Sequence, residues 1–194
     1  QETLDIIGRH HTVDQTIESF KLARSLGFDN INMDLIMGLP EEDIDDVRHT
    51  MEVLKELDPD NITIHSLAIK RAARLNIFKD RYESMQMVNT QEHMDLCADY
   101  CKKMGLSPYY LYRQKGMAGN MENVGYAKPG KAGVYNVLIM EERQTIIACG
   151  AGASTKKVCP GGAIERCENV KDVGLYMKRI DEMIARKQQL FSEK

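Results

Sequence analysis

The sequence predicts an α/β fold, with a piece of an α/β barrel followed by a smaller α+β region. Helix, strand, helix and strand alternate with short connections over residues 13–68, which is typical of β-α-β crossovers and a parallel sheet. Farther on, the pattern changes to a long helix, a strand, a long loop, a hairpin and a final helix. We therefore divide the chain into residues 1–75, the β/α units, and residues 76–194, the α+β region.

The first predicted helix and strand follow each other directly. A helix over Val13–Leu26 begins after a capping box formed by Thr12 and Gln15, and Gly27 ends it. The strand that follows covers Asn30–Ile36 and stops at a Gly-Leu-Pro turn.

The second pair of elements repeats this order. Three acids, Glu41, Glu42 and Asp43, precede the next helix and suit the positive end of its dipole. An Asp-Pro-Asp turn then leads to a strand over Asn61–Ala68.

The remaining elements follow a basic patch at 70–74. We expect a long helix ending near Met104, a strand over 108–112, a loop over 115–133, a hairpin of strands 134–140 and 145–149, a tight turn over 150–154 and a helix over 170–191.

Composition excludes several classes of protein. Hydrophobic residues make up 43% and charged residues 28%, which is ordinary for a globular protein and not for a disordered tail or a coiled coil. The net charge of −3 argues against a nucleic-acid partner. No apolar run approaches a membrane span and no signal-peptide pattern opens the chain, so we expect a cytoplasmic protein without a membrane partner. The start at Gln1 is expected of a processed protein or an excised fragment.

The five cysteines are interpreted as reduced thiols. Cys97, Cys101 and Met104 have the outline of CxxxCxxC, an iron–sulfur motif, but the third position is methionine. The same residues fall on one stripe of a helical pattern, which favours core packing over ligation. The other three cysteines lack a metal-like spacing, so we assign no metal ligand.

Asp34 is the most informative polar residue. Ile31, Met33 and Leu35 form one apolar face of its strand, whereas Asn32 and Asp34 share the other. A carboxylate that faces a barrel interior is costly unless it is paired or binds a ligand. Asp34 also lies near the carboxyl end of its strand, where α/β proteins hold ligands. Two interpretations stay open: a contact to a ligand such as a ribose hydroxyl, or a buried pair with a nearby Arg or Lys.

Other candidates are weaker. His65 is interpreted as a hydrogen-bonded structural residue rather than an acid or base, and His10 and His11 as exposed. Lys70, Arg71 and Arg74 suit either a carboxylate site or a solvated turn. Two interpretations of the turn at 150–154 stay open: its backbone amides lie close to a ligand, or the segment is only a turn.

Several motifs in a fixed order resemble a known family. The sequence is similar to the oxygen-independent coproporphyrinogen III oxidase family of radical S-adenosylmethionine (radical SAM) enzymes, the HemN group, and within it to the HemZ-type coproporphyrinogen dehydrogenase branch. The resemblance rests on the segments Ile7–Val13, Asn30–Pro40, Ile64–Leu75, Tyr110–Gln114, Tyr126–Gly130 and Gly150–Ser154, with Asn136.

This resemblance implies a fold, a reaction and a cofactor site. The fold would be the C-terminal part of a partial TIM-type (radical SAM) barrel followed by the family's α+β region. A 4Fe–4S cluster would cleave S-adenosylmethionine to a radical that oxidatively decarboxylates coproporphyrinogen III propionates to vinyls, giving protoporphyrinogen IX. By position, the cofactor contacts would be Arg9, Asp34, Ala68, Gly152 and Ser154. No catalytic residue is assigned, and the electron donor stays unidentified.

The family's cluster motif lies upstream of every segment present here. We therefore expect this chain to be a C-terminal fragment that is inactive alone and that self-associates through its open sheet edge. Arg71 and Arg74 are hypothetical partners of the tetrapyrrole propionates. The alternatives are a haem-binding chaperone of the same family, a radical SAM enzyme with another substrate, and a fragment that folds but binds nothing.

Overall fold

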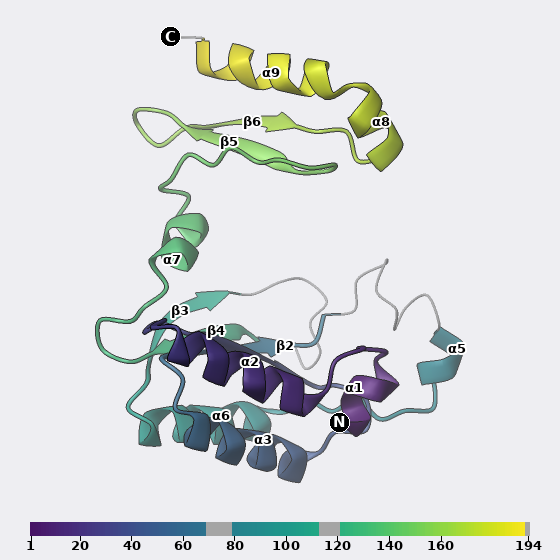
Figure 1. Ribbon diagram of the computed structural model, residues 1–194, viewed down its shortest axis with the longest axis vertical. Coiled ribbons are helices and arrows are strands. Elements are labelled where there is room, and N and C mark those ends of the chain that lie inside the picture. Colours follow the sequence, from purple (N-terminus) through teal and green to yellow (C-terminus); the bar gives the residue numbers. More distant parts are fainter. Residues whose placement is uncertain (69–78, 113–120, 193–194) are drawn as a thin grey trace. The chain divides into compact units, whose positions relative to one another are not determined.

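A computed structural model describes residues 1–68, 79–112 and 121–192 of the chain (Figure 1). These residues form two compact units, 1–133 and 134–194. The predicted division at residue 75 lies outside the described residues and stays a prediction.

The first unit is a mixed four-stranded sheet with helices. Its strand order is β1-β2-β4-β3, in which β1 and β2 are parallel and the other pairs are antiparallel. The strands are β1 (Asn32–Met37), β2 (Asn61–Ser66), β3 (Ser107–Tyr112) and β4 (Asn123–Ala127). The helices are α1 (Glu2–Ile6), α2 (Val13–Ser25), α3 (Ile44–Leu57), α5 (Lys79–Tyr82) and α6 (Gln91–Lys103).

Side chains at the helix starts explain where the β/α units begin. Thr12 and Gln15 form the expected capping box at the start of α2. At α3 the carboxylate of Asp43 accepts hydrogen bonds from the backbone of Asp45 and Asp46, so that helix begins at Ile44. The predicted helix–strand alternation and the parallel pair are confirmed.

Helices α3 and α6 lie side by side and cover one face of this sheet (Figure 1). Ile62 and Ile64 of β2 are fully buried beneath them, and Cys97 and Cys101 of α6 belong to the same core. The prediction that the two cysteines are core residues on a helix is therefore confirmed. The other buried members of this core are Met37, Val47, Met51, Leu54, Met94, Tyr100, Leu106 and Tyr126.

A buried carboxylate holds the start of the parallel pair together. Asp60 accepts a hydrogen bond from the backbone N–H of Ile31 at 2.9 Å and pairs with Arg24 of α2 at 2.7 Å. Burial raises the pKa of Asp60, but the backbone hydrogen bond and Arg24 outweigh burial, and its pKa lies below the usual value. Asp60 thus ties α2 to the ends of β1 and β2.

The second unit contains the hairpin of β5 (Ser154–Val158) and β6 (Ile164–Glu168), with helices α7 (Val134–Met140), α8 (Val173–Lys178) and α9 (Ile180–Ser192). Thr155 and Met183 are its most buried side chains. Gly152 has φ of +72° in the turn before β5, a conformation that a residue with a side chain rarely adopts. In the parts of both units that the structure describes, no helix is long and apolar enough to span a membrane.

Two predicted strands are wrong. Residues 134–140 form helix α7, and residues 145–149 contribute only an isolated bridge between Ile146 and Lys156. An apolar run of seven residues fits either a strand or a helix, because its periodicity does not distinguish them. The actual hairpin, β5 with β6, lies directly after the predicted one.

Three further boundaries differ from the sequence-based expectation. The loop predicted over 115–133 contains β4, in which Val124 and Tyr126 face the core and Gly125 faces away. The glycines and asparagines around β4 obscure this short alternation. Helix α6 begins only at Gln91, and the C-terminal helix is divided into α8 and α9 near Arg179.

Candidate functional site

The face of the sheet opposite α3 and α6 carries polar side chains on neighbouring strands. Asn32 and Asp34 of β1 lie beside Thr63 and His65 of β2, because the parallel register pairs Asn32 with Asn61 and Asp34 with Thr63. Period-two alternation puts the apolar neighbours of these residues into the core. The prediction that Asn32 and Asp34 share one face of their strand is therefore confirmed.

Asp34 makes its polar contacts within this row. Its Oδ1 accepts a hydrogen bond from Asn32 Nδ2 at 2.7 Å and lies 3.6 Å from His65 Nε2. The contact with His65 lowers the pKa of Asp34, partial burial opposes this, and the net pKa lies below the usual value. Asp34 is therefore an ionised acceptor, and the basic side chain that it contacts is a histidine rather than the Arg or Lys of the alternative interpretation.

The row continues to the far strand of the sheet. Thr63 Oγ1 donates to Asn32 Oδ1 at 3.0 Å, and the side chains of Thr63 and Tyr110 also interact. The ring of Tyr110 lies directly over Gly125, where a Cβ atom would be only 2.0 Å from the ring. Gly125 thus allows a tyrosine on β3 to extend across β4 and reach Thr63 on β2.

A pocket of about 370 Å³ adjoins β1 and contains two of the predicted cofactor contacts. Arg9 and Asp34 both line it, together with His11 and Glu42. Apolar side chains of α1 and its C-cap, of β1 and of α3 supply much of the remaining lining: Leu4, Ile7, Leu35, Met37 and Val47. The pocket therefore combines an apolar wall with a cation and carboxylates, as small-molecule sites do.

Sequence reasoning missed Glu42 as a pocket residue. Burial raises the pKa of Glu42, an interaction with Thr3 opposes this, and the net pKa lies above its usual value. Its position in an acidic helix start suggested only a dipole contact, and no local pattern distinguishes it from Glu41. His11 is exposed, as predicted, and it also lines the pocket, which the sequence did not indicate.

The other predicted contacts lie elsewhere in the chain. Ala68 is half-buried just beyond the end of β2. Gly152 and Ser154 belong to the second unit, where Ser154 Oγ donates to Glu168 Oε1 at 2.7 Å. Arg71 and Arg74 lie outside the described residues. The assignment of Ala68, Gly152 and Ser154 to a cofactor stays a prediction.

The two buried cysteines of α6, Cys97 and Cys101, are poor ligands for an iron–sulfur cluster. Burial raises the pKa of both Cys97 and Cys101 to about 12, which disfavours the thiolate that binds iron. Within residues 1–68, 79–112 and 121–192, no three His, Cys, Asp or Glu side chains are grouped as a metal site.

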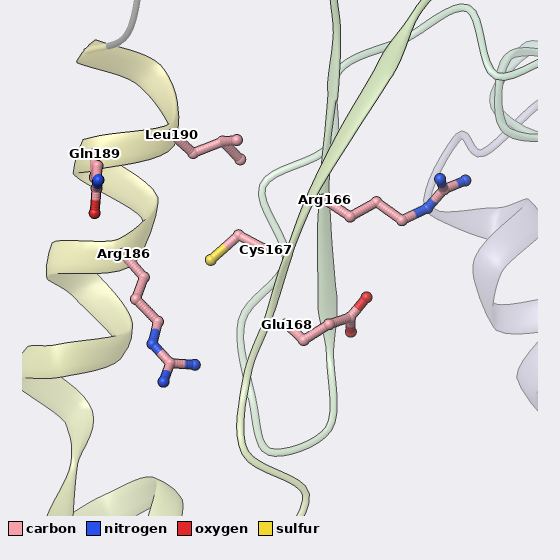
Figure 2. Close-up of a pocket in the computed structure, with 6 residues that line it drawn as sticks. All are labelled: Arg166, Cys167, Glu168, Arg186, Gln189 and Leu190. Carbon is pink, nitrogen blue, oxygen red and sulfur yellow. The ribbon is translucent and has the colours of Figure 1, made fainter.

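The second unit has a hollow of about 320 Å³ between β6 and α9 (Figure 2). Cys167 points toward α9, whereas Arg166 and Glu168 point to the opposite side of the strand. Arg166 is paired with Glu142, and Arg186 of α9 with Glu182. Since each arginine already contacts a carboxylate and Arg166 points away from α9, this hollow is a weak candidate for an anion site.

Comparisons with known proteins place these observations in a family. A model of the radical SAM superfamily matches residues 1–54. The oxygen-independent coproporphyrinogen-III oxidase-like protein HemZ of Bacillus subtilis is 43% identical over 99% of this chain and 39% of its own length. The heme chaperone HemW of Escherichia coli is 26% identical over 92% of this chain and 43% of its own length.

A solved structure agrees on the fold. The coproporphyrinogen III oxidase HemN of Escherichia coli, described as a radical SAM enzyme, matches with a TM-score of 0.66 at 16% identity, over 93% of this chain and 41% of that one. The chain thus spans about two fifths of the length of these relatives. Its mixed α/β fold is that of part of the HemN structure, including the parallel β/α units of a partial barrel. On the sequence match to HemZ and this fold, the chain belongs to the HemN/HemZ-like family of radical SAM proteins.

Proposed function

We propose that the whole protein is a radical SAM oxidoreductase of porphyrin biosynthesis, and that this chain forms one side of its S-adenosylmethionine pocket. The reaction would be the oxidative decarboxylation of coproporphyrinogen III propionates to vinyl groups. The observation that carries the proposal is the shared pocket of Arg9 and Asp34 beside β1, in a chain similar to HemZ over nearly all its residues.

The chemistry of this pocket suits S-adenosylmethionine. That molecule carries a carboxylate and an ammonium group on its methionine part, two ribose hydroxyls, an uncharged aromatic adenine and a positively charged sulfonium. Asp34 offers an ionised acceptor to a hydroxyl or ammonium donor, and Arg9 offers a cation to a carboxylate. The apolar wall of Ile7 and Leu35 suits the uncharged part of such a ligand.

When bound, S-adenosylmethionine would supply the species that removes one hydrogen atom from the substrate. The propionate side chain then loses CO₂ and one electron to become a vinyl group, and the acceptor of that electron is a separate component. The role of Arg9 and Asp34 in this reaction is to bind and orient the cofactor. Since the thiols of Cys97 and Cys101 do not suit a cluster, no step is assigned to them.

The chain alone is expected to be inactive, because its described residues offer no cluster site. We also propose that the tetrapyrrole contacts include Arg71 and Arg74. Replacing both by Ala in the full-length protein should then weaken substrate binding, and an unchanged substrate affinity would reject this assignment.

Self-association of the chain is a further part of the proposal. Strand β1 is at the edge of the four-stranded sheet, and β2 is its partner among the described strands. An open edge pairs readily with another chain. Light scattering should therefore detect dimers or larger species, and a dilute monomer would contradict this. The cytoplasmic location stays a prediction.

A haem-carrying function is the second candidate, because the heme chaperone HemW is also similar over most of the chain. The distinguishing experiment uses the full-length protein under anaerobic conditions, with a reconstituted cluster, S-adenosylmethionine, an electron donor and coproporphyrinogen III. Formation of protoporphyrinogen IX supports the oxidase. Tight haem binding without product formation would support the chaperone, and sequencing upstream for CxxxCxxC tests whether a cluster motif exists at all.

A further inference from the structure

We infer that His65 is a positioning residue that holds the Asp34 carboxylate in the orientation in which it accepts a donor group of the bound ligand. This inference rests on the proposed function and adds a residue to the S-adenosylmethionine site. It concerns the row of polar side chains formed by Tyr110, Thr63, Asn32, Asp34 and His65.

Two side chains contact the same carboxylate oxygen of Asp34. Asn32, two residues earlier on β1, donates to Oδ1 at 2.7 Å. His65 approaches the same Oδ1 from β2, with its Nε2 at 3.6 Å. Both contacts therefore meet at Oδ1, and the side chain of Thr63 also interacts with this carboxylate. In this inference, the carboxylate held in this way is the group that accepts a ligand donor. Contacts of this length in a ligand-free site tighten once the ligand is bound.

Hydrogen-bond chemistry determines which groups donate and which accept along this row of side chains. An ionised carboxylate only accepts hydrogen bonds, so the group of Asn32 that faces Asp34 must be its NH₂. The amide oxygen of Asn32 then points to Thr63, whose hydroxyl donates to it at 3.0 Å. Tyr110, lying over Gly125, contacts Thr63 in turn. Asp34 is thus held by side chains from three strands.

Exposure argues that the Asp34–His65 contact is not there for stability. The side chains of Asp34 and His65 are 65% and 35% exposed, and ion pairs this exposed contribute about 0–1 kcal/mol to folding. A bound ligand that excludes water would strengthen the same contact, because the effective dielectric constant falls. Loss of His65 should therefore be felt in ligand binding much more than in folding.

The experiment measures S-adenosylmethionine binding to the full-length protein by anaerobic equilibrium dialysis, with the thermal midpoint recorded for each variant. His65→Leu removes the ring donor, whereas His65→Gln keeps an N–H donor on a side chain of similar reach. Asp34→Asn tests the carboxylate itself. His49→Gln, at an exposed histidine on α3, is the matched control.

The expected result is rescue by the conservative variant. His65→Leu should raise the Kd about tenfold, as loss of one contact to a charged group does, and His65→Gln should stay within about threefold of wild type. Asp34→Asn should raise the Kd at least as much as His65→Leu. His49→Gln should have no effect, and all four thermal midpoints should stay near that of wild type.

A failure of the proposed function and a failure of the role of His65 give different results. If the wild type does not bind S-adenosylmethionine, the proposed function fails and the inference fails with it. If Asp34→Asn weakens binding but His65→Leu does not, the proposed function stands and the role of His65 is rejected. If both His65 variants lose binding equally and lower the thermal midpoint, His65 is a structural residue and the inference is overturned.

Discussion

The two faces of the first unit's sheet carry opposite chemistry on the same strands. On the face under α3 and α6, Ile62 and Ile64 are fully buried among apolar side chains. On the other face, Asp34 and His65 remain partly exposed and contact each other. Consecutive strand residues point to opposite faces, so β2 serves both. We infer that the covered face maintains the fold, and that the polar face, together with the pocket that adjoins β1, binds a ligand. This predicts different consequences for substitutions at Ile64 and at Asp34.

The largest loss of stability is expected on the covered face. Ile64→Ala removes a fully buried side chain and leaves a cavity under α3 and α6, so it should lower the free energy of unfolding by about 3–4 kcal/mol. Pulsed alkylation of Cys97 and Cys101 measures opening of this core, because both thiols are fully buried. A change below about 1 kcal/mol would contradict the assignment of this core.

A smaller loss is expected where Asp60 joins α2 to the sheet. Asp60→Ala leaves the Ile31 N–H and Arg24 without their buried partner and should cost about 2–3 kcal/mol. Because the pKa of Asp60 is lowered in the folded state, its contribution is present above the ordinary pKa and is lost as pH falls through the lower value. Urea titrations should therefore show the variant and wild type converging below about pH 4. A difference that does not depend on pH would argue against an ionised Asp60.

Gly125→Ala should have an intermediate effect on stability and should also weaken ligand binding. The new Cβ would overlap the Tyr110 ring, which must move, at a cost of about 1–2 kcal/mol. Displacing the ring also breaks its contact with Thr63, so ligand affinity should fall although Gly125 itself has no polar side chain. Denaturant unfolding and S-adenosylmethionine binding of the full-length protein measure the two effects. Gly105→Ala is a useful comparison, since its Cβ would meet no atom within 4 Å, although its φ of +75° adds strain.

The smallest effect on stability is expected at Asp34. Its side chain is largely exposed, so Asp34→Asn should change the free energy of unfolding by less than about 0.5 kcal/mol. The pKa of Asp34 is lowered, so any stabilisation exists above the ordinary pKa and disappears as pH falls through the lower one. A loss above about 1.5 kcal/mol in denaturant unfolding would show that Asp34 maintains the fold.

How much the sequence predicts depends on how local the signal is. The capping box at Thr12, the alternation along β1 and the helical stripe containing Cys97 are local patterns, and the structure confirms each of them. The run at 134–140 is equally local but fits two periodicities, and the helix prevailed.

Contacts between distant segments are a different matter. The proximity of Arg9 and Asp34 was expected only from the resemblance to a family, because no spacing places them in one pocket. Glu42 joined this pocket, and His65 paired with Asp34, through the folding of separate elements. Register between β1 and β2 decides the Asp34–His65 contact, and that register depends on the packing of the whole unit.

The most direct test of the central claim compares Asp34→Asn with Ile64→Val in the full-length protein. For each variant, S-adenosylmethionine affinity is measured by equilibrium dialysis and core opening by alkylation of Cys97 and Cys101. Each variant is predicted to change only one of the two measured quantities. Asp34→Asn should lower the affinity for S-adenosylmethionine with little change in core opening. Ile64→Val should make core opening easier by about 1 kcal/mol and leave the affinity unchanged. If Asp34→Asn binds S-adenosylmethionine as tightly as wild type, the polar face is not the ligand site and the division between the two faces is wrong.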